Sequence, residues 1–268
     1  MEKRDIVVIG GSAGSVPALI EVVKVLPAGL QAAILIVMHV SPNVPSLLPQ
    51  ILSRAGTLPA AHARDGDLME TGRIYIAPPD RHLLLESNQV LVKKGPKENR
   101  FRPSIDALFR SAAYSYGARV IGVVLSGLLD DGTSGLWAVK RMGGLSVVQE
   151  PEEALCASMP SNVLEYVEVD YTLPSAEIGR LLPRLTGEEG RLESQPLQEE
   201  LKRLETEIKI AAQQNAFDMG ILNLGRPAPL TCPECHGALV ELTEGNLTRY
   251  RCHTGHSFTQ SSLLSGVY

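Results

Sequence analysis

Ser12, His39 and Asp131 are residue types that together make a hydrolytic site, and each closely follows an apolar run of the sequence. A serine nucleophile needs a base to take its proton and an acid to hold that base in one tautomer. The sequence alone does not choose between Asp131 and its neighbour Asp130 as this acid. The shared place of these residues behind apolar runs favours a hydrolase site over unrelated residues in turns.

The turn that carries the serine, Gly10-Gly11-Ser12-Ala13-Gly14, fits the G-x-S-x-G pattern of a nucleophile elbow. A dinucleotide-binding turn is excluded, because the glycine spacing is wrong and the next apolar run ends in His39 instead of an acidic residue. A glycine-rich strand-to-helix turn with an incidental serine is the alternative that this motif leaves open. Ser15 is the expected N-cap of the helix that follows.

Apolar runs alternate with helical segments over the first part of the chain. Strands without polar alternation are buried on both faces, so the pattern predicts an α/β fold: a doubly wound, mostly parallel sheet with helices on both faces. Ligands of such sheets bind beyond the carboxyl ends of the strands, where the three candidate residues are expected. The expected strands are 6–9, 32–38, 73–77, 120–125 and 145–148, the expected helices are 16–23, 46–54, 103–116 and 134–141, and a hairpin is expected over 83–92.

The composition excludes several classes of protein. With 268 residues and 44% hydrophobic content, the chain can bury a core and still form a small second domain. The 30 acidic and 25 basic residues, with a net charge of −5, give no electrostatic case for binding nucleic acid or an anionic membrane. No apolar stretch is long enough for membrane insertion, and the polar start differs from a secretion signal, so we expect a cytoplasmic protein.

The order serine, histidine, aspartate differs from that of α/β-hydrolases, in which the acid precedes the histidine. Several motifs instead occur in the order seen in CheB-type protein-glutamate methylesterases, and the chain resembles this family over roughly residues 5 to 185. These motifs are Ile9–Ser15, Met38-His39, Ala77–His82, Arg102–Asp106 and Leu125–Gly132.

The resemblance implies a serine hydrolase that demethylates glutamate methyl esters on chemoreceptors in chemotaxis-type signalling, and often deamidates receptor glutamines. It assigns Ser12 as the nucleophile, His39 as the general base and Asp131 as the orienting acid, with no cofactor for catalysis. Backbone N–H groups near Ala13 are expected to form part of an oxyanion hole. The implied partners are the cytoplasmic domains of methylated chemoreceptors and other chemosensory signalling proteins.

Several features near the expected site have two possible roles or depart from the usual family pattern. Arg81 and His82 lie in a motif that the family places near its cleft, so they either contact substrate or belong to a loop held by hydrogen bonds. The chain departs from the usual family pattern at Ala13 and Ser15, where threonine and glycine are usual, and at Gly127-Leu128-Leu129, where G-M-G is common. The receiver domain that usually precedes this domain is absent from the sequence, so we expect no control through phosphorylation of such a domain.

The rest of the chain is predicted to form a linker and a small second unit. Residues 188–195 are polar and charged, 197–211 carry apolar residues at helical spacing, and 225–229 are a break that contains glycine and proline. The helix is expected to dock on the first domain, in preference to a second chain. The predicted domains are a methylesterase domain over 1–187, a linker with an amphipathic helix over 188–229, and a zinc-ribbon-like module over 230–268.

The last segment carries a metal-binding pattern. Cys232 and Cys235 form a C-x-x-C pair, and Cys252 and His256 follow an expected hairpin, an arrangement typical of a tetrahedral zinc site. His253 is the reserve candidate for the fourth ligand, because ligation by adjacent Cys252 and His253 would be awkward. Four protein ligands leave no open position for water, so the predicted zinc is structural.

Two other functions stay open at this point. The chain could be a non-catalytic signalling adaptor whose tail binds a partner, or a carboxylesterase that acts on small molecules. The presence of Ser12, His39 and Asp131 together favours an enzyme over an adaptor.

Overall fold

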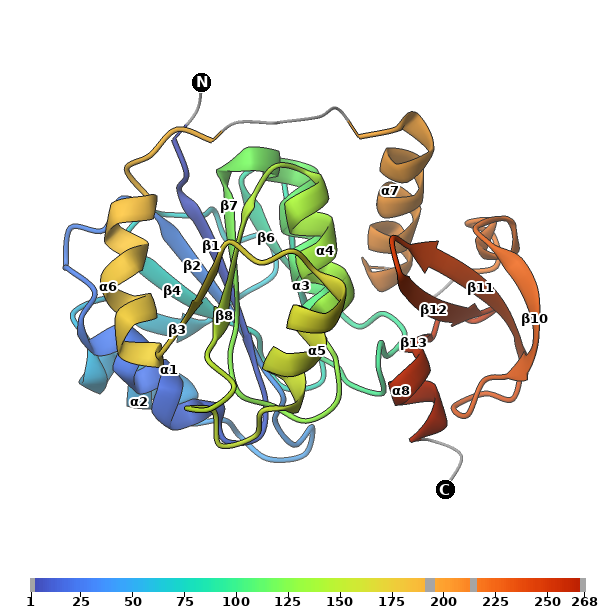
Figure 1. Ribbon diagram of the computed structural model, residues 1–268, viewed down its shortest axis with the longest axis horizontal. Coiled ribbons are helices and arrows are strands. Elements are labelled where there is room, and N and C mark those ends of the chain that lie inside the picture. The colour runs from blue at the N-terminus through green and yellow to red at the C-terminus, as the bar shows by residue number, and fades with distance from the viewer. Residues whose placement is uncertain (1–2, 191–195, 213–215, 266–268) are drawn as a thin grey trace.

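The computed structural model describes residues 3–190, 196–212 and 216–265, and a seven-stranded sheet forms its centre (Figure 1). Its strands are β1 (Ile6–Gly11), β2 (Ala33–Met38), β3 (Ala60–His62), β4 (Arg73–Ile76), β7 (Val120–Val124), β8 (Leu145–Gln149) and β9 (Tyr171–Leu173). They follow one another across the sheet as β3-β4-β2-β1-β7-β8-β9, and all neighbours are parallel.

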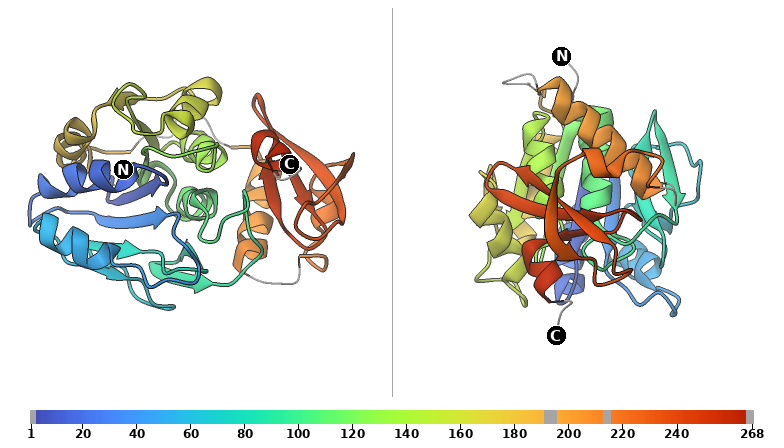
Figure 2. Two further views of the ribbon diagram at one scale, coloured as in Figure 1. Left: turned by 90° about the horizontal axis from the view of Figure 1, so that it is seen from below. Right: turned by 90° about the vertical axis from the view of Figure 1, so that its right-hand side faces the viewer.

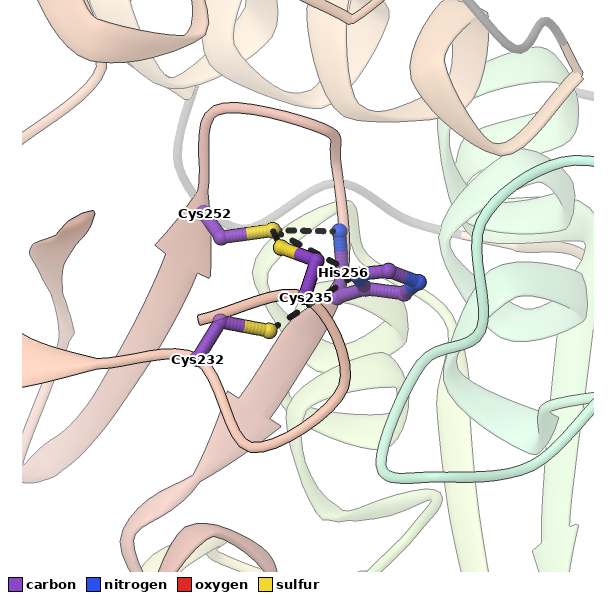
Figure 3. Close-up of side chains that lie close together, drawn as sticks. All are labelled: Cys232, Cys235, Cys252 and His256. Atoms are coloured by element: carbon purple, nitrogen blue, oxygen red, sulfur yellow. Dashed lines mark hydrogen bonds between the residues drawn. The ribbon is translucent and has the colours of Figure 1, made fainter. Parts of the chain in front are cut away.

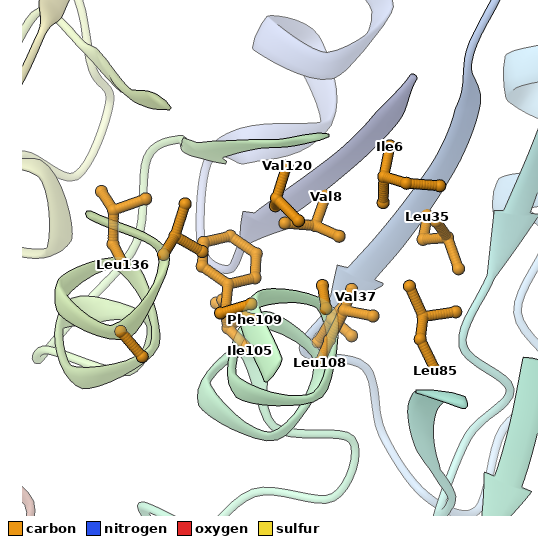
Figure 4. Close-up of a cluster of buried hydrophobic side chains, with 14 of the residues drawn as sticks. Ile6, Val8, Leu35, Val37, Leu85, Ile105, Leu108, Phe109, Val120 and Leu136 are labelled. Atoms are coloured by element: carbon orange, nitrogen blue, oxygen red, sulfur yellow. The ribbon is translucent and has the colours of Figure 1, made fainter. Parts of the chain in front are cut away.

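Helices cover both faces of this sheet. They are α1 (Ser15–Lys24), α2 (Leu48–Ala55), α3 (Ile105–Tyr116), α4 (Thr133–Arg141), α5 (Ser158–Tyr166) and α6 (Ser175–Leu185), with a 3-10 turn at Gly117–Arg119. One hydrophobic core joins α1, α2 and α6 to the sheet, and a second joins α3, α4 and α5 (Figure 4 shows part of the second). Along β1, Val7 and Ile9 face the first core while Ile6 and Val8 face the second, because side chains alternate along a strand.

This architecture confirms the predicted doubly wound α/β fold. Within the α/β domain, the strands and helices that were not predicted from the sequence are β3, β9, α5 and α6. The two strands are short edge strands without an apolar run, and the two helices contain Pro160 and Pro183, which interrupt a helical pattern.

The start of α1 differs from the prediction. Gly14, with a left-handed backbone at φ 76°, precedes the helix, so the predicted N-cap role of Ser15 is wrong. Ser15 is the first helical residue, and its hydroxyl donates a hydrogen bond of 2.5 Å to the carbonyl oxygen of Ser12. The Ser15 side chain therefore braces the turn that carries Ser12.

A hairpin and a C-terminal unit complete the structure. β5 (His82–Glu86) and β6 (Gln89–Lys93) pair antiparallel, as predicted, through the turn Ser87-Asn88. Further along the chain come α7 (Gln198–Ala212), a 3-10 turn (Ile221–Asn223), the four-stranded sheet of β10 (Arg226–Thr231), β11 (Ala238–Glu244), β12 (Leu247–Cys252) and β13 (Ser257–Thr259), and α8 (Gln260–Leu264). This second sheet and α7 lie together on one side of the α/β domain (Figure 2).

The helix predicted over 197–211 is present as α7, and it packs on α3 and on the β5–β6 hairpin of the same chain. Its buried residues are Leu204, Ile210, Ala211 and, unexpectedly, the charged Glu207. The polar segment predicted over 188–195 lies largely outside the described residues.

The break predicted at 225–229 is wrong, because β10 runs from Arg226 to Thr231 at the edge of the second sheet. An edge strand tolerates Pro227 and Pro229, since only one of its sides is paired and the missing N–H groups can face outward. We call residues 226–265 the C-terminal module. Its first strand, β10, begins before the boundary predicted at residue 230.

Candidate active site

The strands β1, β2 and β7 are neighbours at the centre of the parallel sheet. After β1 the chain winds outward through β2, and it later returns to place β7 on the opposite side of β1. Ligand sites of doubly wound sheets lie beyond the carboxyl ends of the strands at such a reversal. The turn after β1 carries Ser12, the turn after β2 carries His39, and the loop after β7 carries Asp131.

Ser12, His39 and Asp131 form a chain of hydrogen bonds at this edge. The Nδ1 atom of His39 is 3.1 Å from the Oγ atom of Ser12, and its Nε2 atom is 2.8 Å from Oδ2 of Asp131. An ionised carboxylate only accepts hydrogen bonds, so Nε2 carries the imidazole hydrogen and Nδ1 can accept the serine proton. The structure therefore brings the three residues together in the order that a serine hydrolase needs.

The carboxylate of Asp131 is buried and strongly hydrogen bonded. Besides His39 it accepts bonds from Asn99 Nδ2 at 2.8 Å, Ser104 Oγ at 2.9 Å and the Ile105 N–H at 2.7 Å. Burial alone would raise the pKa of Asp131, but the bond from His39 and these further donors lower it below its usual range. Asp131 is therefore ionised at neutral pH, as the orienting acid of a triad must be.

The structure distinguishes Asp131 from Asp130, which the sequence alone did not. The Asp130 carboxylate accepts hydrogen bonds of 2.7 Å from Thr259 Oγ1 and of 2.7 Å from Ser261 Oγ, both in the C-terminal module. Burial raises the pKa of Asp130, against the lowering effect of these two hydroxyl donors. Asp131 is the carboxylate that holds His39.

The turn around Ser12 lies against the loop that follows β7. The Ser12 N–H donates to the carbonyl oxygen of Ser126 at 3.0 Å. A Cβ atom at Gly127 would lie 2.9 Å from the Cβ of Ser12, so glycine is needed for this close approach. Within the described part of the chain the Ala13 N–H has no acceptor, and it lies just before α1, where the helix dipole favours negative charge. It is therefore available to an oxyanion that forms at Ser12.

His82 and Arg81 have different environments. His82 is completely buried, with Nε2 2.8 Å from the carbonyl oxygen of Pro96 and Nδ1 accepting the Ser104 N–H at 3.3 Å. The substrate contact predicted for His82 is therefore wrong, and the alternative of a loop held by hydrogen bonds describes it. Arg81 is half-buried and donates to the carbonyl oxygen of Asp80, and its contact with substrate stays a prediction.

Asn99, Phe101 and Ser104 are neighbours of the candidate triad that were not predicted from the sequence. Asn99 and Ser104 bond to Asp131, and the ring of Phe101 stacks on the His39 imidazole. Ser104 lies within the motif Arg102–Asp106, which was a signal for the site. Asn99 and Phe101 precede that motif in a charged loop that has no pattern of its own.

The predicted metal ligands also form a cluster, which lies in the C-terminal module (Figure 3). One ligand atom from each residue lies within 4.8 Å of all the others, and the residues are Cys232, Cys235, Cys252 and His256. The Sγ atoms of Cys235 and Cys252 are 3.6 Å apart, and Nδ1 of His256 is 3.6 Å from Cys232 Sγ. Tetrahedral zinc with Zn–S bonds of about 2.3 Å requires ligand separations of about this size. The geometry and the soft donors therefore fit zinc.

His253, the reserve candidate, lies outside this cluster. A Cβ atom at Gly237 would be 2.0 Å from ring atoms of His253, which shows that this imidazole packs on the Gly237 backbone. The geometry therefore places His256 with the three cysteines.

Known proteins share the fold of the α/β domain. The chain matches the family described as CheB methylesterase over residues 7–182. It is similar to protein-glutamate methylesterase/protein-glutamine glutaminase 2 of Methanosarcina mazei, with 36% identity over 179 residues, which are 64% of this chain and 49% of that protein. A Leptospira interrogans relative, provisionally named for the same two activities, is 37% identical over 180 residues, 67% of this chain and 93% of that protein.

A solved structure covers the same region. The crystal structure of the Thermotoga maritima CheB methylesterase catalytic domain has a TM-score of 0.65 to this chain at 34% identity, and the match covers 69% of this chain and 100% of that one. The chain spans about half the length of the Methanosarcina protein, and the family match ends before α7. Among the described residues no helix is both long enough and apolar enough to cross a membrane.

Proposed function

Because this chain belongs to the CheB methylesterase family, we propose that it is a serine hydrolase that demethylates glutamate methyl esters on chemoreceptors. The hydrogen-bond chain from Ser12 through His39 to Asp131 is the observation that carries this proposal. The two relatives described above are named for this hydrolysis and for glutaminase activity. The family predicted from the sequence motifs is confirmed by the match over residues 7–182.

In the proposed reaction, Ser12 Oγ attacks the ester carbonyl carbon while Nδ1 of His39 takes the hydroxyl proton. The Ala13 N–H donates to the developing oxyanion, a contribution of about 3 kcal/mol for one such donor. His39 then gives its proton to the departing methanol, which leaves an acyl-enzyme on Ser12. A water molecule deprotonated by His39 hydrolyses this acyl-enzyme, and Asp131 stays ionised throughout.

The same steps accommodate a glutamine side chain, with ammonia as the leaving group instead of methanol. We therefore include deamidation of receptor glutamines in the proposal. The partners that we propose are the cytoplasmic domains of methylated chemoreceptors, since they carry the esterified glutamates, and other chemosensory signalling proteins through contacts outside the site.

We also propose that the cluster of Cys232, Cys235, Cys252 and His256 holds a structural zinc ion. These four ligands complete a tetrahedral shell, which leaves no position for substrate. None of the cysteines forms a disulfide, and thiolate ligands persist in a reducing compartment, which supports a cytoplasmic location.

Methanol release from a radiomethylated chemoreceptor fraction tests the proposed reaction. Wild-type protein should release methanol, and Ser12→Ala should lower the rate at least about a thousandfold. Ser53→Ala, which changes an exposed serine on α2, is the matched control and should equal wild type. Equal release by wild type and Ser12→Ala would remove Ser12 from the mechanism.

Two further outcomes would replace the proposal. Hydrolysis of a nitrophenyl ester without methanol release would indicate an esterase for small molecules. Receptor binding without hydrolysis of either substrate would indicate an adaptor.

A further inference from the structure

The C-terminal module reaches the active site through the loop of residues 94–104, which connects β6 to α3 (Figure 1). The Asn99 N–H donates to the carbonyl oxygen of Ser257 at 2.7 Å, and the Ser257 N–H donates to that of Lys97 at 3.3 Å. Glu98 and Ser257 form a parallel bridge, so the loop extends the sheet of the module beyond β13. The position of this loop is therefore tied to the position of the module.

The side chain of Asn99 connects the module to the candidate triad. Its Nδ2 donates to Oδ1 of Asp131 at 2.8 Å and to Oδ2 of Asp106 at 2.8 Å. Its Oδ1 accepts the Thr259 N–H at 3.0 Å and the Ser262 hydroxyl at 3.2 Å. Thr259 and Ser262 thus fix which end of the amide faces the carboxylates, since a flipped amide would oppose its oxygen to them.

The same end of the module also holds the residue next to Asp131. Thr259 is the N-cap of α8, and its side chain and that of Ser262 form a reciprocal capping box. The Thr259 hydroxyl donates to Asp130, as does the hydroxyl of Ser261. The first turn of α8 therefore contacts both Asp130 and, through Asn99, Asp131.

A buried ion network fastens the module to the α/β domain. Arg251 of β12 binds Glu98 of the loop at 2.7 Å and Glu207 of α7 at 2.8 Å. Arg249 binds Glu207 at 2.6 Å, and Arg110 of α3 pairs with Glu98. All five side chains are at most 1% exposed, so separating the module would leave buried charges without partners.

The metal cluster lies at the start of the segment that contacts Asn99. Cys252 ends β12, and His256 directly precedes β13, which leads into Thr259 and α8. A metal ion held by these residues together with Cys232 and Cys235 would fix the turn between β12 and β13. Such an ion would therefore have a short covalent path to the capping residues of α8.

We propose that the C-terminal module is a positioning element of the active site: Thr259 and Ser262 orient the Asn99 amide, Asn99 orients Asp131, and the metal cluster keeps this segment in place. The inference rests on the proposed hydrolysis and gives the module a role in the reaction besides any part in partner choice. Asn99, Thr259 and Ser262 touch no substrate in this scheme and act through Asp131 and His39.

A double-mutant cycle tests the path through Asn99. Ser262→Ala should lower kcat about tenfold with KM unchanged, because the amide loses one of the bonds that hold it. Asn99→Ala should lower kcat further, and adding Ser262→Ala to it should have no additional effect. Gln260→Ala, which changes an exposed residue of α8, is the control and should match wild type. Fully additive effects, or Ser262→Ala equal to the control, would overturn the inference.

Zinc removal tests the role of the metal cluster, and the chain contains an internal probe for it. Trp137, the single tryptophan of the sequence, lies against the β11–β12 turn, where a Cβ at Gly245 would be 3.0 Å from its Nε1. A chelator should shift the Trp137 emission to the red as the module detaches, and kcat should fall in parallel. Restoring zinc should reverse both changes. A shifted emission with kcat unchanged would overturn the inference.

The proton NMR resonance of the His39 Nε2–H separates failure of this inference from failure of the proposed function, because it needs no substrate. Ser262→Ala and chelation should each move this resonance, whereas Gln260→Ala should not. If the resonance moves in a protein that hydrolyses no ester, the positioning holds and the proposed reaction is wrong. If the resonance stays fixed while wild type is active, the positioning is wrong and the reaction stands.

Discussion

The Phe101 ring lies flat against the His39 imidazole, with ring centroids 3.8 Å apart and an angle of 8° between the planes. The imidazole is thereby covered on one face while its two nitrogen atoms bond to Ser12 and Asp131. Stacking of this kind opposes rotation of the ring about its bond to Cβ and keeps water off one face. Phe101 belongs to the loop that pairs with the C-terminal module, so the base and its covering ring come from different parts of the fold.

Phe101→Ala should therefore lower kcat about tenfold while KM changes little, because the imidazole leaves its productive orientation more often. Steady-state kinetics on a methyl ester or a nitrophenyl ester measures the effect. Phe101→Tyr keeps an aromatic face and serves as the control, with kcat close to wild type. A wild-type kcat in Phe101→Ala would show that the hydrogen bonds alone hold His39.

Asp131→Asn and Asp130→Asn form a matched pair of adjacent substitutions. Asp131→Asn should lower kcat about ten-thousandfold, because an amide stabilises neither the required tautomer nor the imidazolium. Asp130→Asn should lower kcat by less than about tenfold, because Asp130 bonds to Thr259 and Ser261 instead of His39. Steady-state kinetics gives kcat for the two variants, and circular dichroism checks that both are folded. The reverse ranking would reassign the orienting acid to Asp130.

His256→Ala and His253→Ala discriminate between the candidate zinc ligands. His256→Ala should lose most of the bound zinc at limiting metal concentrations, because it removes one of the clustered ligand atoms. His253→Ala should keep its zinc, since that ring packs on Gly237. The zinc content of each variant is measured by mass spectrometry after gel filtration. Zinc loss from His253→Ala alone would exchange the two assignments.

The buried network should make stability depend on pH through Glu98. Burial alone would raise its pKa, but the charges of Arg110 and Arg251 lower the pKa of Glu98 from 4.5 to about 2. Because the folded-state pKa is the lower one, this stabilisation is complete above the unfolded-state value of 4.5 and is lost as the pH falls toward 2.

Glu98→Gln tests this dependence. At neutral pH it should lower the free energy of unfolding by about 3–5 kcal/mol, because it leaves buried arginine charges unpaired. The difference from wild type should narrow between pH 4.5 and pH 3, as followed by urea unfolding. Glu70→Gln, which alters an exposed pair with Arg73, should change stability little at any pH. A difference for Glu98→Gln that is constant with pH would contradict the prediction.

The parts of this protein that could be predicted from the sequence are those with a short local pattern of residues. The apolar runs of β1, β2 and β7 identify buried strands, and the residues after them are Ser12, His39 and the pair that includes Asp131. The ligand spacing around Cys232 and Cys252 likewise depends on a short local pattern. The reaction expected of these residues was predicted from the motifs that the chain shares with the family.

The contacts that the sequence did not predict join distant segments. Glu207 occupies the buried face of α7, where the helical pattern alone assigns charged residues to solvent, because arginines of β12 neutralise it. Asn99 lies in a charged loop, and its significance depends on carboxylates and on α8 meeting there in space. His82 was predicted at a cleft because its motif is near one, although burial excludes it from the surface. Contacts between distant segments leave no local pattern in the sequence from which they could be predicted.

The contacts between the C-terminal module and the loop of residues 94–104 also predict an order of events in refolding. Glu98 and Arg251 are 153 positions apart, and Asn99 and Thr259 are 160 positions apart. Contacts between such distant positions close large chain loops and therefore tend to form late in refolding. The central sheet should thus recover its circular dichroism before esterase activity returns, and the lag between the two should lengthen when zinc is withheld. Catalytic competence would then be the last property that this chain acquires.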